Sequence, residues 1–316
     1  MSTMSRPVGI VVAGIGRAGR ARIRDITGNV LGENVARLLG VISSGYILLN
    51  SRHKPDDIKA SFLSWDEALS RSDVDAVIIC TENGTHEEYA KKCLDAGKHV
   101  LADFPLTISS NATKCLIELA EKKGVVCQEE DIGLLTPAFK ELFDLMKSKP
   151  RVIEASMVFT ASLQPSAWIS DLKRAGFPSF SGVNRLHMLH ELFGEMSVKE
   201  ARMTEDSDKR EMVATLLTKD NLLIVWTESR ATGNDRTFTF HFTFEDGSTM
   251  DYSPRMGPPP RPAPPTTPPK GLFAGDLNLF LQKIRGEVSE EELAREAKRV
   301  VHCAEVAGKI EEMATM

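Results

Sequence analysis

The chain has 316 residues, which is too long for one ordinary hydrophobic core and fits two domains of common size. Its formal net charge of -5, with no dense run of Lys or Arg, argues against nucleic acid and anionic membranes as partners. Five scattered cysteines without C-x-x-C spacing, and no apolar run of membrane-spanning length, predict a reduced, cytoplasmic protein that binds small molecules.

Five short apolar runs alternate with helical stretches between Val8 and Glu130. The runs are "VGIVVA", "VARLLGVIS", "VDAVIIC", "KHVLAD" and "GVVCQ". Runs of this length, bounded by turns and separated by helices, are typical of βαβ units whose parallel sheet is buried on both faces. Residues 1–131 are therefore predicted to form a Rossmann domain, a doubly wound parallel α/β sheet.

The pattern changes after Pro137. Segments such as "RVIEASMVFTAS", "MVATLLT" and "RTFTFHFTFEDGSTMDYS" alternate apolar and polar residues, as half-buried antiparallel strands do. Residues 132–316 are therefore predicted to form an α+β substrate-binding domain with a large, mainly antiparallel sheet and a C-terminal helix. Two segments depart from this plan. The insertion "SGYILLNS" (44–51) lengthens a connection that is usually short, and the proline-rich residues 254–271 predict an extended loop or a ligand for a proline-recognition module.

Glycines follow the first predicted strand in G-x-G-x-x-G spacing. Gly14 permits a tight turn, Gly16 lets the backbone approach a pyrophosphate, and Gly19 lets helix and strand pack closely. The phosphates then face the N-terminus of the following helix. The loop residues Ile15, Arg17 and Ala18 are accordingly predicted to contact a dinucleotide cofactor.

The end of the second strand bears on which nicotinamide cofactor binds. An enzyme committed to NAD usually carries an acid here, whereas this strand ends in Ser43 and Ser44. Arg52 follows the insertion and is either a partner for the 2′-phosphate of NADPH or a solvated loop charge. NADPH is thus predicted as the cofactor, with NADH also accepted.

The carboxyl ends of the third and fourth strands should line the same ligand crevice. Thr81, Glu82 and Asn83 end the third strand and are predicted near the nicotinamide ribose. His86 opens the next helix, where it is either a cofactor contact or a structural histidine.

These motifs, with "TENGTH" and "GKHVLADFP", resemble the glucose-fructose oxidoreductase and inositol dehydrogenase family along the whole chain. That family commonly has Glu-Lys-Pro where this chain has Asp103, Phe104 and Pro105, which implies a cofactor contact for Asp103. It also has an Asp and a His where this chain has Phe180 and Asn184. The acid-base set for oxidising a sugar alcohol is therefore missing.

The segments "GFPSFSGVNRL", "LDAGKHVLADFPLT" and "EEELAREAKRVVHC" look like the biliverdin reductase branch of that family. The resemblance implies NAD(P)H-dependent reduction of the central methine carbon of biliverdin to give bilirubin, a step of heme catabolism, by a monomeric enzyme. It marks Arg185 as essential, by electrostatic stabilisation more than by proton donation, and Phe104 as an apolar wall for the flat pigment. The other predicted substrate contacts are Glu129, Glu130, Arg174, Phe180 and Asn184.

Several alternatives stay open at this point. Glu129 and Glu130 are either pigment contacts or a solvated hinge, and Arg174 is either a propionate partner or a surface charge. No metal site is predicted, since His302 and Cys303 alone are a poor ligand set. The competing functions are a dehydrogenase for a sugar or small alcohol and a non-catalytic dinucleotide sensor.

Overall fold

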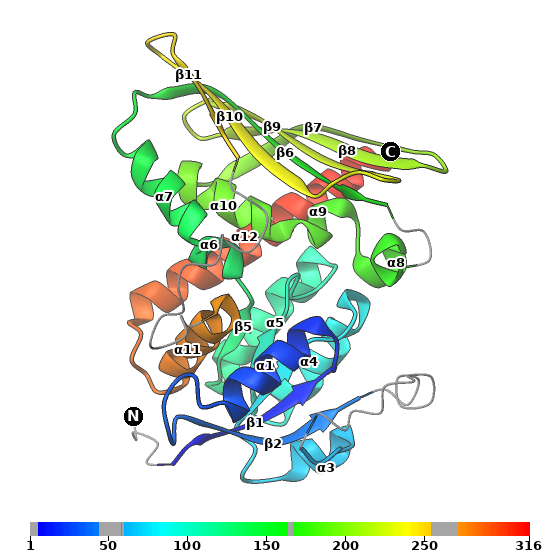
Figure 1. The fold of residues 1–316 in the computed structure, drawn as a ribbon, viewed down its shortest axis with the longest axis vertical. Helices are drawn as coiled ribbons and strands as arrows, with labels where there is room; N and C mark the ends of the chain where they lie inside the picture. The colour runs from blue at the N-terminus through cyan, green and yellow to red at the C-terminus, as the bar shows by residue number, and fades with distance from the viewer. Residues whose placement is uncertain (1–5, 44–57, 59, 164–166, 254–270) are drawn as a thin grey trace, which may run out of the picture. The chain divides into compact units, whose positions relative to one another are not determined.

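The computed structural model describes residues 6–43, 58, 60–163, 167–253 and 271–316, which divide into two compact units (Figure 1). The first unit contains the described chain up to Thr107, Asn111–Ile132, and the chain from residue 271 to Lys298. The second contains Ile108–Ser110, the described chain between Gly133 and residue 253, and Arg299–Met316. Residues 271–298, which the sequence analysis assigned to the second domain, thus group with the first unit.

A five-stranded parallel sheet forms the centre of the first unit, in the order β2-β1-β3-β4-β5. Its strands are β1 (Val8–Ala13), β2 (Ala36–Ile42), β3 (Ala76–Ile79), β4 (His99–Ala102) and β5 (Cys127–Glu129). Every residue of β1 and β3 is buried, as expected of a parallel sheet covered on both faces. A single parallel bridge from Phe62 to Val41 adds the remnant of a further strand beside β2. With this remnant, the strand order is that of a dinucleotide-binding sheet. Successive strands are added on one side of β1 up to the remnant, and from β3 onward they are added on the other side.

Helices complete the core of this unit. They are α1 (Arg17–Thr27), α3 (Trp65–Ser70), α4 (His86–Asp95), α5 (Ser110–Lys123) and α11 (Leu272–Ile284), with a 3-10 turn, η1 (Asn83–Thr85). Leu277, Phe280 and Leu281 of α11 pack in the same apolar cluster as Ile10 and Ile78 of the sheet. This burial explains why α11 belongs to the first unit although it follows the second sheet in the chain.

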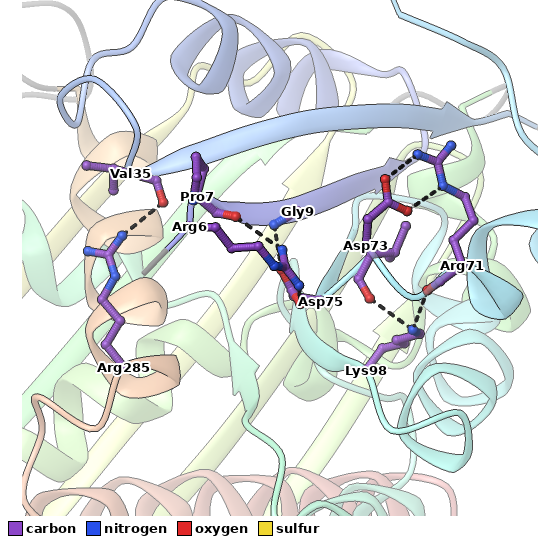
Figure 2. Close-up of polar contacts among 10 residues, drawn as sticks. Arg6, Pro7, Gly9, Val35, Arg71, Asp73, Asp75, Lys98 and Arg285 are labelled. Atoms are coloured by element: carbon purple, nitrogen blue, oxygen red, sulfur yellow. Dashed lines mark hydrogen bonds and ion pairs between the residues drawn. The ribbon is translucent and has the colours of Figure 1, made fainter. Parts of the chain in front are cut away.

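The amino ends of the strands are held by ion pairs and capped carbonyl groups (Figure 2). Asp75, just before β3, accepts two hydrogen bonds from Arg6 at 2.7 and 2.8 Å and one from the backbone N–H of Gly9 at 2.7 Å. Lys98 donates to the carbonyl oxygens of Arg71 and Val74 at 2.8 and 2.9 Å. These contacts stabilise the edge of the sheet opposite to the carboxyl ends of its strands.

A six-stranded mixed sheet forms the second unit, in the order β11-β10-β6-β9-β8-β7 (Figure 1). Its strands are β6 (Val152–Ser162), β7 (Met196–Glu205), β8 (Lys209–Thr218), β9 (Leu223–Ala231), β10 (Thr237–Phe244) and β11 (Thr249–Tyr252). Only the β6–β9 pair is parallel, so the prediction of a mainly antiparallel sheet is confirmed. Alternate residues of β10, from Phe238 to Phe244, are buried phenylalanines, which places the core on one face.

Helices cover that buried face. The helical elements of this part of the chain are α6 (Ile132–Leu135), α7 (Pro137–Met146), η2 (Trp168–Ser170), α8 (Leu172–Ala175), α9 (Pro178–Ser181), α10 (Val183–Phe193) and α12 (Glu290–Ala314). Phe193 of α10 packs on Phe242 of β10, with ring centroids 6.3 Å apart. The backbone N–H of Met196 donates to His302 of α12 at 3.0 Å, which ties that helix to β7. In the described residues of both units, no helix combines the length and apolar character needed to cross a membrane.

Candidate functional site

The glycine-rich turn has the geometry that a dinucleotide phosphate requires. Gly14 has a φ of +92°, a left-handed conformation that L side chains rarely adopt. A Cβ on Gly19 would lie 1.9 Å from the carbonyl oxygen of Gly14, so only glycine lets α1 pack this closely on β1. A Cβ on Gly16 would meet nothing within 4 Å, because this residue faces open space at the start of α1.

The residues between these glycines divide by exposure. Ile15 is buried and packs in the core, Ala18 is half-buried, and Arg17 is exposed. The turn therefore presents the exposed backbone of Gly16 and the positive N-terminal end of α1, which suits a pyrophosphate. Contacts of Ile15, Arg17 and Ala18 with the cofactor stay a prediction.

The end of β2 is only partly described. Ser43 is half-buried, and in the described part of the chain its hydroxyl has no hydrogen-bond partner. Ser44, Arg52 and the insertion lie outside the described residues, as does the proline-rich segment. The choice between NADPH and NADH at this end therefore stays a prediction.

The loop after β3 is fixed by short local contacts. The hydroxyl of Thr81 lies 2.8 Å from that of Thr85, which donates to the carbonyl oxygen of Glu82 at 2.7 Å. Asn83 begins η1 and is buried. These bonds hold Thr81 and Glu82, both half-buried, at the carboxyl end of β3, and their contact with the cofactor stays a prediction.

His86 corrects one of the predicted cofactor contacts. Its side chain is fully buried, and its two ring nitrogens lie 2.8 Å from the carbonyl oxygen of Pro105 and 3.1 Å from that of Thr81. Burial lowers the pKa of the ring, although the two carbonyl groups oppose the shift. Both nitrogens lie against backbone carbonyl oxygens, so His86 joins the loops after β3 and β4, and its full burial favours the structural role over the cofactor contact.

The loop after β4 carries Asp103 and Phe104, both half-buried. The Phe104–Pro105 peptide bond is cis, and the backbone N–H of Leu106 donates to the carboxylate of Glu129 at 2.5 Å. Glu129 is 4% exposed, so it holds this loop and is not available as the pigment contact that the sequence predicted. Phe104 therefore lies on a loop that hydrogen bonds to His86 and Glu129 hold in place.

Buried charges lie beneath this edge of the sheet. Arg22 of α1 is fully buried and donates to Asp276 of α11 at 2.5 Å and to the carbonyl oxygen of Phe273 at 2.7 Å. Burial alone would lower the pKa of Arg22, but the carboxylates around it raise the pKa, so the guanidinium stays charged. Burial raises the pKa of Asp103 and also that of Glu130, which is 3% exposed. Glu130 is thus a buried acid and not a solvated hinge, and direct contact with a pigment does not fit this burial.

Arg185 is the central cation of the second unit. It lies near the start of α10, is 6% exposed, and donates to both carboxylate oxygens of Glu228 on β9, through Nη2 at 2.8 Å and through a shorter bond from Nε. The indole N–H of Trp226 donates to the same carboxylate at 3.0 Å. The guanidinium also lies 3.9 Å from the centre of the Phe159 ring. Arg185 is therefore rigidly held through Nε and Nη2, whereas its Nη1 makes a longer contact, 3.4 Å, with the side-chain oxygen of Asn184.

More arginines gather around Phe159, and sequence reasoning missed them. Arg230 and Arg236 each place a guanidinium 5.7 Å from the centre of that ring. Arg230 also lies directly opposite Arg210 of β8 in the sheet. Burial lowers the pKa of Arg230, and repulsion from Arg185, Arg236 and Arg210 lowers it further. Arg210 is paired with Glu205 at 2.5 Å and Glu228 attracts Arg230, so part of this repulsion is compensated within the chain. The half-buried Arg230 and the exposed Arg236 are cations of the kind that binds a carboxylate.

A signal for this arginine cluster is present in the sequence. In "IVWTESR" the residues at 224, 226 and 228 are buried in alternation, so Glu228 falls where an apolar residue is expected, and Arg230 follows in the same alternation as a half-buried residue. A buried charge such as Glu228 is paired or functional.

The remaining predicted substrate contacts are dispersed. Phe180 is 1% exposed and packs inside the second unit, so it is a core residue and not a pigment contact. Asn184 is half-buried beside Arg185, whereas Arg174 is exposed on α8. Asn184 therefore lies with the arginine cluster, and the role of Arg174 stays a prediction.

Comparison with known proteins agrees with this division of the chain. Residues 8–130 match the family model described as "Oxidoreductase family, NAD-binding Rossmann fold", and residues 146–256 match "Biliverdin reductase, catalytic". Biliverdin reductase A of Homo sapiens is 35% identical over 97% of this chain and 96% of its own length. The Mus musculus protein is also 35% identical, over 98% of this chain and 96% of its own length.

Solved structures support the same fold. A biliverdin reductase from Synechocystis, in complex with biliverdin and NADP+, has a TM-score of 0.80 at 20% identity and covers 98% of this chain and 100% of its own. A putative myo-inositol dehydrogenase from Sinorhizobium meliloti has a TM-score of 0.72 at 16% identity and covers 98% and 97%. At such identities the likeness shows the fold alone, whereas the mammalian relatives are similar enough, over nearly the full length, to show the family. The chain therefore belongs to the biliverdin reductase A family of Rossmann-fold oxidoreductases.

Proposed function

We propose that this chain is an NADPH-dependent biliverdin reductase that converts biliverdin to bilirubin. The observation that carries the proposal is a pair of features in one chain, namely the phosphate-binding turn at Gly14–Gly19 and the arginine cluster around Phe159, in a member of the biliverdin reductase A family. A planar pigment with two propionates needs an aromatic surface and several cations, and the cluster offers both.

The first unit supplies the cofactor site. Its exposed Gly16 backbone and the start of α1 would hold the pyrophosphate, and the loops after β3 and β4 would line the nicotinamide half. NADPH, when bound, supplies a hydride for the central methine carbon of the pigment.

The preference for NADPH over NADH is tested by substitution of Arg52. Arg52→Ala is expected to weaken NADPH binding by about 1–3 kcal/mol more than NADH binding, the range of a charge-assisted hydrogen bond. Titration of nicotinamide fluorescence with both cofactors measures this. Equal losses would remove Arg52 from the 2′-phosphate site.

The second unit supplies the cations. Arg230 and Arg236 would bind propionate carboxylates, and Arg185, held by Glu228, would direct its remaining N–H groups at the pyrrole edge where electron density increases during hydride transfer. Arg185 acts in this proposal as an oriented cation and not as an acid, because a guanidinium keeps its proton at neutral pH. Phe104 would be an apolar wall, and water the ultimate source of the proton.

Alcohol oxidation is the weaker candidate. The position that would hold a lysine carries Phe104, whose ring cannot transfer a proton. We also propose that the protein is cytoplasmic and monomeric, as its family resemblance implies.

One absorbance experiment tests the proposed reaction. Protein, NADPH and biliverdin are mixed, and the long-wavelength band of the green pigment is expected to give way to the band of the yellow product while NADPH is consumed in equal amount. Binding of NADPH without any change in the pigment would refute the reductase, and NADP+ reduction by polyols would favour the dehydrogenase.

A further inference from the structure

The charges of three carboxyl groups act on one arginine at the carboxyl edge of the first sheet. The carboxyl groups belong to Asp103 after β4, Glu130 after β5 and Asp276 on α11, and the arginine is Arg22 of α1. We call these four residues the acid cluster. The backbone N–H of Glu130 donates to the carbonyl oxygen of Ala102 at 2.7 Å, which sets Glu130 beside the Ala102–Asp103 segment. Arg22, Glu130 and Asp276 are at most 4% exposed.

The charges of the acid cluster do not balance if every carboxyl group is ionised. Arg22 is a single cation, and its Nη2 is committed to Asp276 at 2.5 Å. Lys283 of α11, a second buried cation, is bonded to Gln128 at 2.7 Å and paired with Glu296. Asp103 and Glu130 thus share the remaining attraction of one guanidinium that is already paired.

The groups around these two carboxyls do not supply the missing charge. Burial lowers the pKa of His86 of α4 and so disfavours a second cation beside Asp103, although the carbonyl oxygens of Pro105 and Thr81 oppose this shift. Cys80, after β3, contacts Asp103 at 3.5 Å as a thiol whose pKa burial raises. Asp131 adds a further negative charge near Glu130.

Glu130 is the carboxyl group that is least satisfied. Its Oε1 is buried, and in the described part of the chain this atom has no hydrogen-bond partner. An ionised carboxylate in such a place is very unfavourable, whereas a neutral acid is tolerated. In agreement, burial and the charge of Asp103 raise the pKa of Glu130 well above its usual range.

The acid cluster lies on the nicotinamide side of the crevice. In this sheet order the adenosine half of a dinucleotide is read at the end of β2, so the nicotinamide half lies toward the ends of β3, β4 and β5. The oxidised nicotinamide ring carries one positive charge more than the reduced ring. A positive charge near a buried acid favours the ionised form of that acid.

We propose that Glu130 is a redox-linked proton store, neutral when the reduced dinucleotide is bound and ionised when the oxidised dinucleotide is bound. The inference rests on the proposed use of NADPH. In each turnover the dinucleotide loses a hydride and becomes more positive by one charge, while Glu130 releases one proton that offsets the proton taken up by the product. Exchange of NADP+ for NADPH then returns a proton from solvent to Glu130, so the total charge of the crevice is constant.

The test is proton release on binding, which needs no turnover. The protein is titrated with NADP+ or NADPH at pH 7 in weak buffer containing a pH indicator. Binding of NADP+ is expected to release up to one proton more per protein than binding of NADPH. Both dinucleotides carry the same 2′-phosphate, so its titration cancels in the comparison.

The pH dependence of affinity gives a second measurement on the unaltered protein. NADP+ selects the ionised form of Glu130, so the ratio of the Kd for NADP+ to the Kd for NADPH is expected to decrease as the pH rises. At pH values below the pKa of Glu130 in the free protein, this decrease is up to tenfold for each pH unit. Equal proton release together with a Kd ratio that is constant from about pH 6 to 9 would overturn the inference.

Substitution assigns the proton to a residue. Glu130→Gln keeps the shape of a neutral acid and is expected to abolish the difference in proton release, whereas Glu118→Gln, at an exposed position of α5, keeps it. Persistence of the difference in a folded Glu130→Gln protein would assign the proton to another group, such as Cys80, and refute the proposal. If the protein binds neither dinucleotide, the cofactor assignment is overturned together with this inference. If it binds both and releases the same number of protons with each, only this inference is overturned.

Discussion

The contact between Glu228 and Arg185 offers a sharp test of how the arginine cluster works. Glu228 is 3% exposed, and its carboxylate accepts two hydrogen bonds from Arg185 and one from Trp226. In Glu228→Gln the side chain keeps its size, but its amide nitrogen is a donor that faces other donors. The variant therefore removes the charge partner of Arg185 while leaving the cation in place.

The structure sets the expected magnitudes. Removal of one partner from a buried ion pair costs about 3–5 kcal/mol, so the free energy of unfolding of Glu228→Gln should fall by that amount. Arg185→Ala should lower kcat/KM by about 100-fold, or ~2.7 kcal/mol of transition-state stabilisation, because the oriented cation is lost. Glu228→Gln should lower kcat/KM by about 10-fold, because the cation remains but is less well oriented.

The double variant separates positioning from an independent contribution. If Glu228 acts only by orienting Arg185, then Glu228→Gln combined with Arg185→Ala should have the kcat/KM of Arg185→Ala alone. Steady-state reduction of biliverdin by the four proteins, with urea unfolding to establish that each is folded, measures this cycle. Losses that multiply to about 1000-fold would refute the positioning role.

A change in stability alone should not imitate this result. Asp75→Asn weakens the Arg6 ion pair and the bond from Gly9 at the amino edge of the first sheet (Figure 2). It should reduce the free energy of unfolding by about 1–2 kcal/mol, since Arg6 is largely exposed and its pairing is screened by water. An unchanged kcat/KM in this variant would show that moderate destabilisation does not account for the effect at Glu228.

Five further substitutions have expected outcomes. Gly16→Val should abolish NADPH binding with little change in the urea midpoint, because its Cβ meets open space. Gly19→Val should unfold the protein, because its Cβ would lie 1.9 Å from a carbonyl oxygen. Similar stability of the two variants would contradict the turn geometry. Phe104→Tyr should change kcat by less than about tenfold, and a gain near a hundredfold would mean that a phenol is the missing donor. Arg230→Ala should raise the KM for biliverdin by about tenfold with a smaller change in kcat, and a fall in kcat alone would contradict a role in binding propionate. Arg185→Lys should restore only part of the activity that is lost in Arg185→Ala.

Local pattern was enough to predict the architecture of both units. The alternation of apolar runs with helices predicts the parallel sheet, and the period of two in "RTFTFHFTFEDG" predicts antiparallel strands; the structure has both. The turn at Gly14 was also predicted from the spacing of the glycines, although in the structure Gly14 donates to the carbonyl oxygen of Ile42 at 2.8 Å and a Cβ on it would lie 2.3 Å from that of Cys80. The patterns that predict these features lie within short stretches of sequence, so they are read without knowledge of the distant contacts.

The candidate site was only partly predictable. Arg185 and Phe104 were reached by resemblance, whereas Glu228, 43 residues from Arg185, was missed because its partner is brought to it only by the packing of α10 on the sheet. The opposition of Arg210 and Arg230 likewise depends on the register of β8 and β9, and a shift of one residue in either strand would turn the arginine of that strand to the other face. His86, Glu129 and Phe180 have polar or aromatic groups suited to ligands, but burial commits them to the fold.

The sequence by itself thus determined the type and order of the elements and the phosphate-binding turn, because period and spacing act locally. Tertiary structure alone decided which charges share a buried environment. Arg22 and Asp276 are 254 residues apart, yet their ion pair fixes α11 in the first unit and leaves Glu130 without a cation of its own. The protonation of a carboxyl group depends on the solvent excluded from it and on the charges within a few ångströms, and the folded chain sets both.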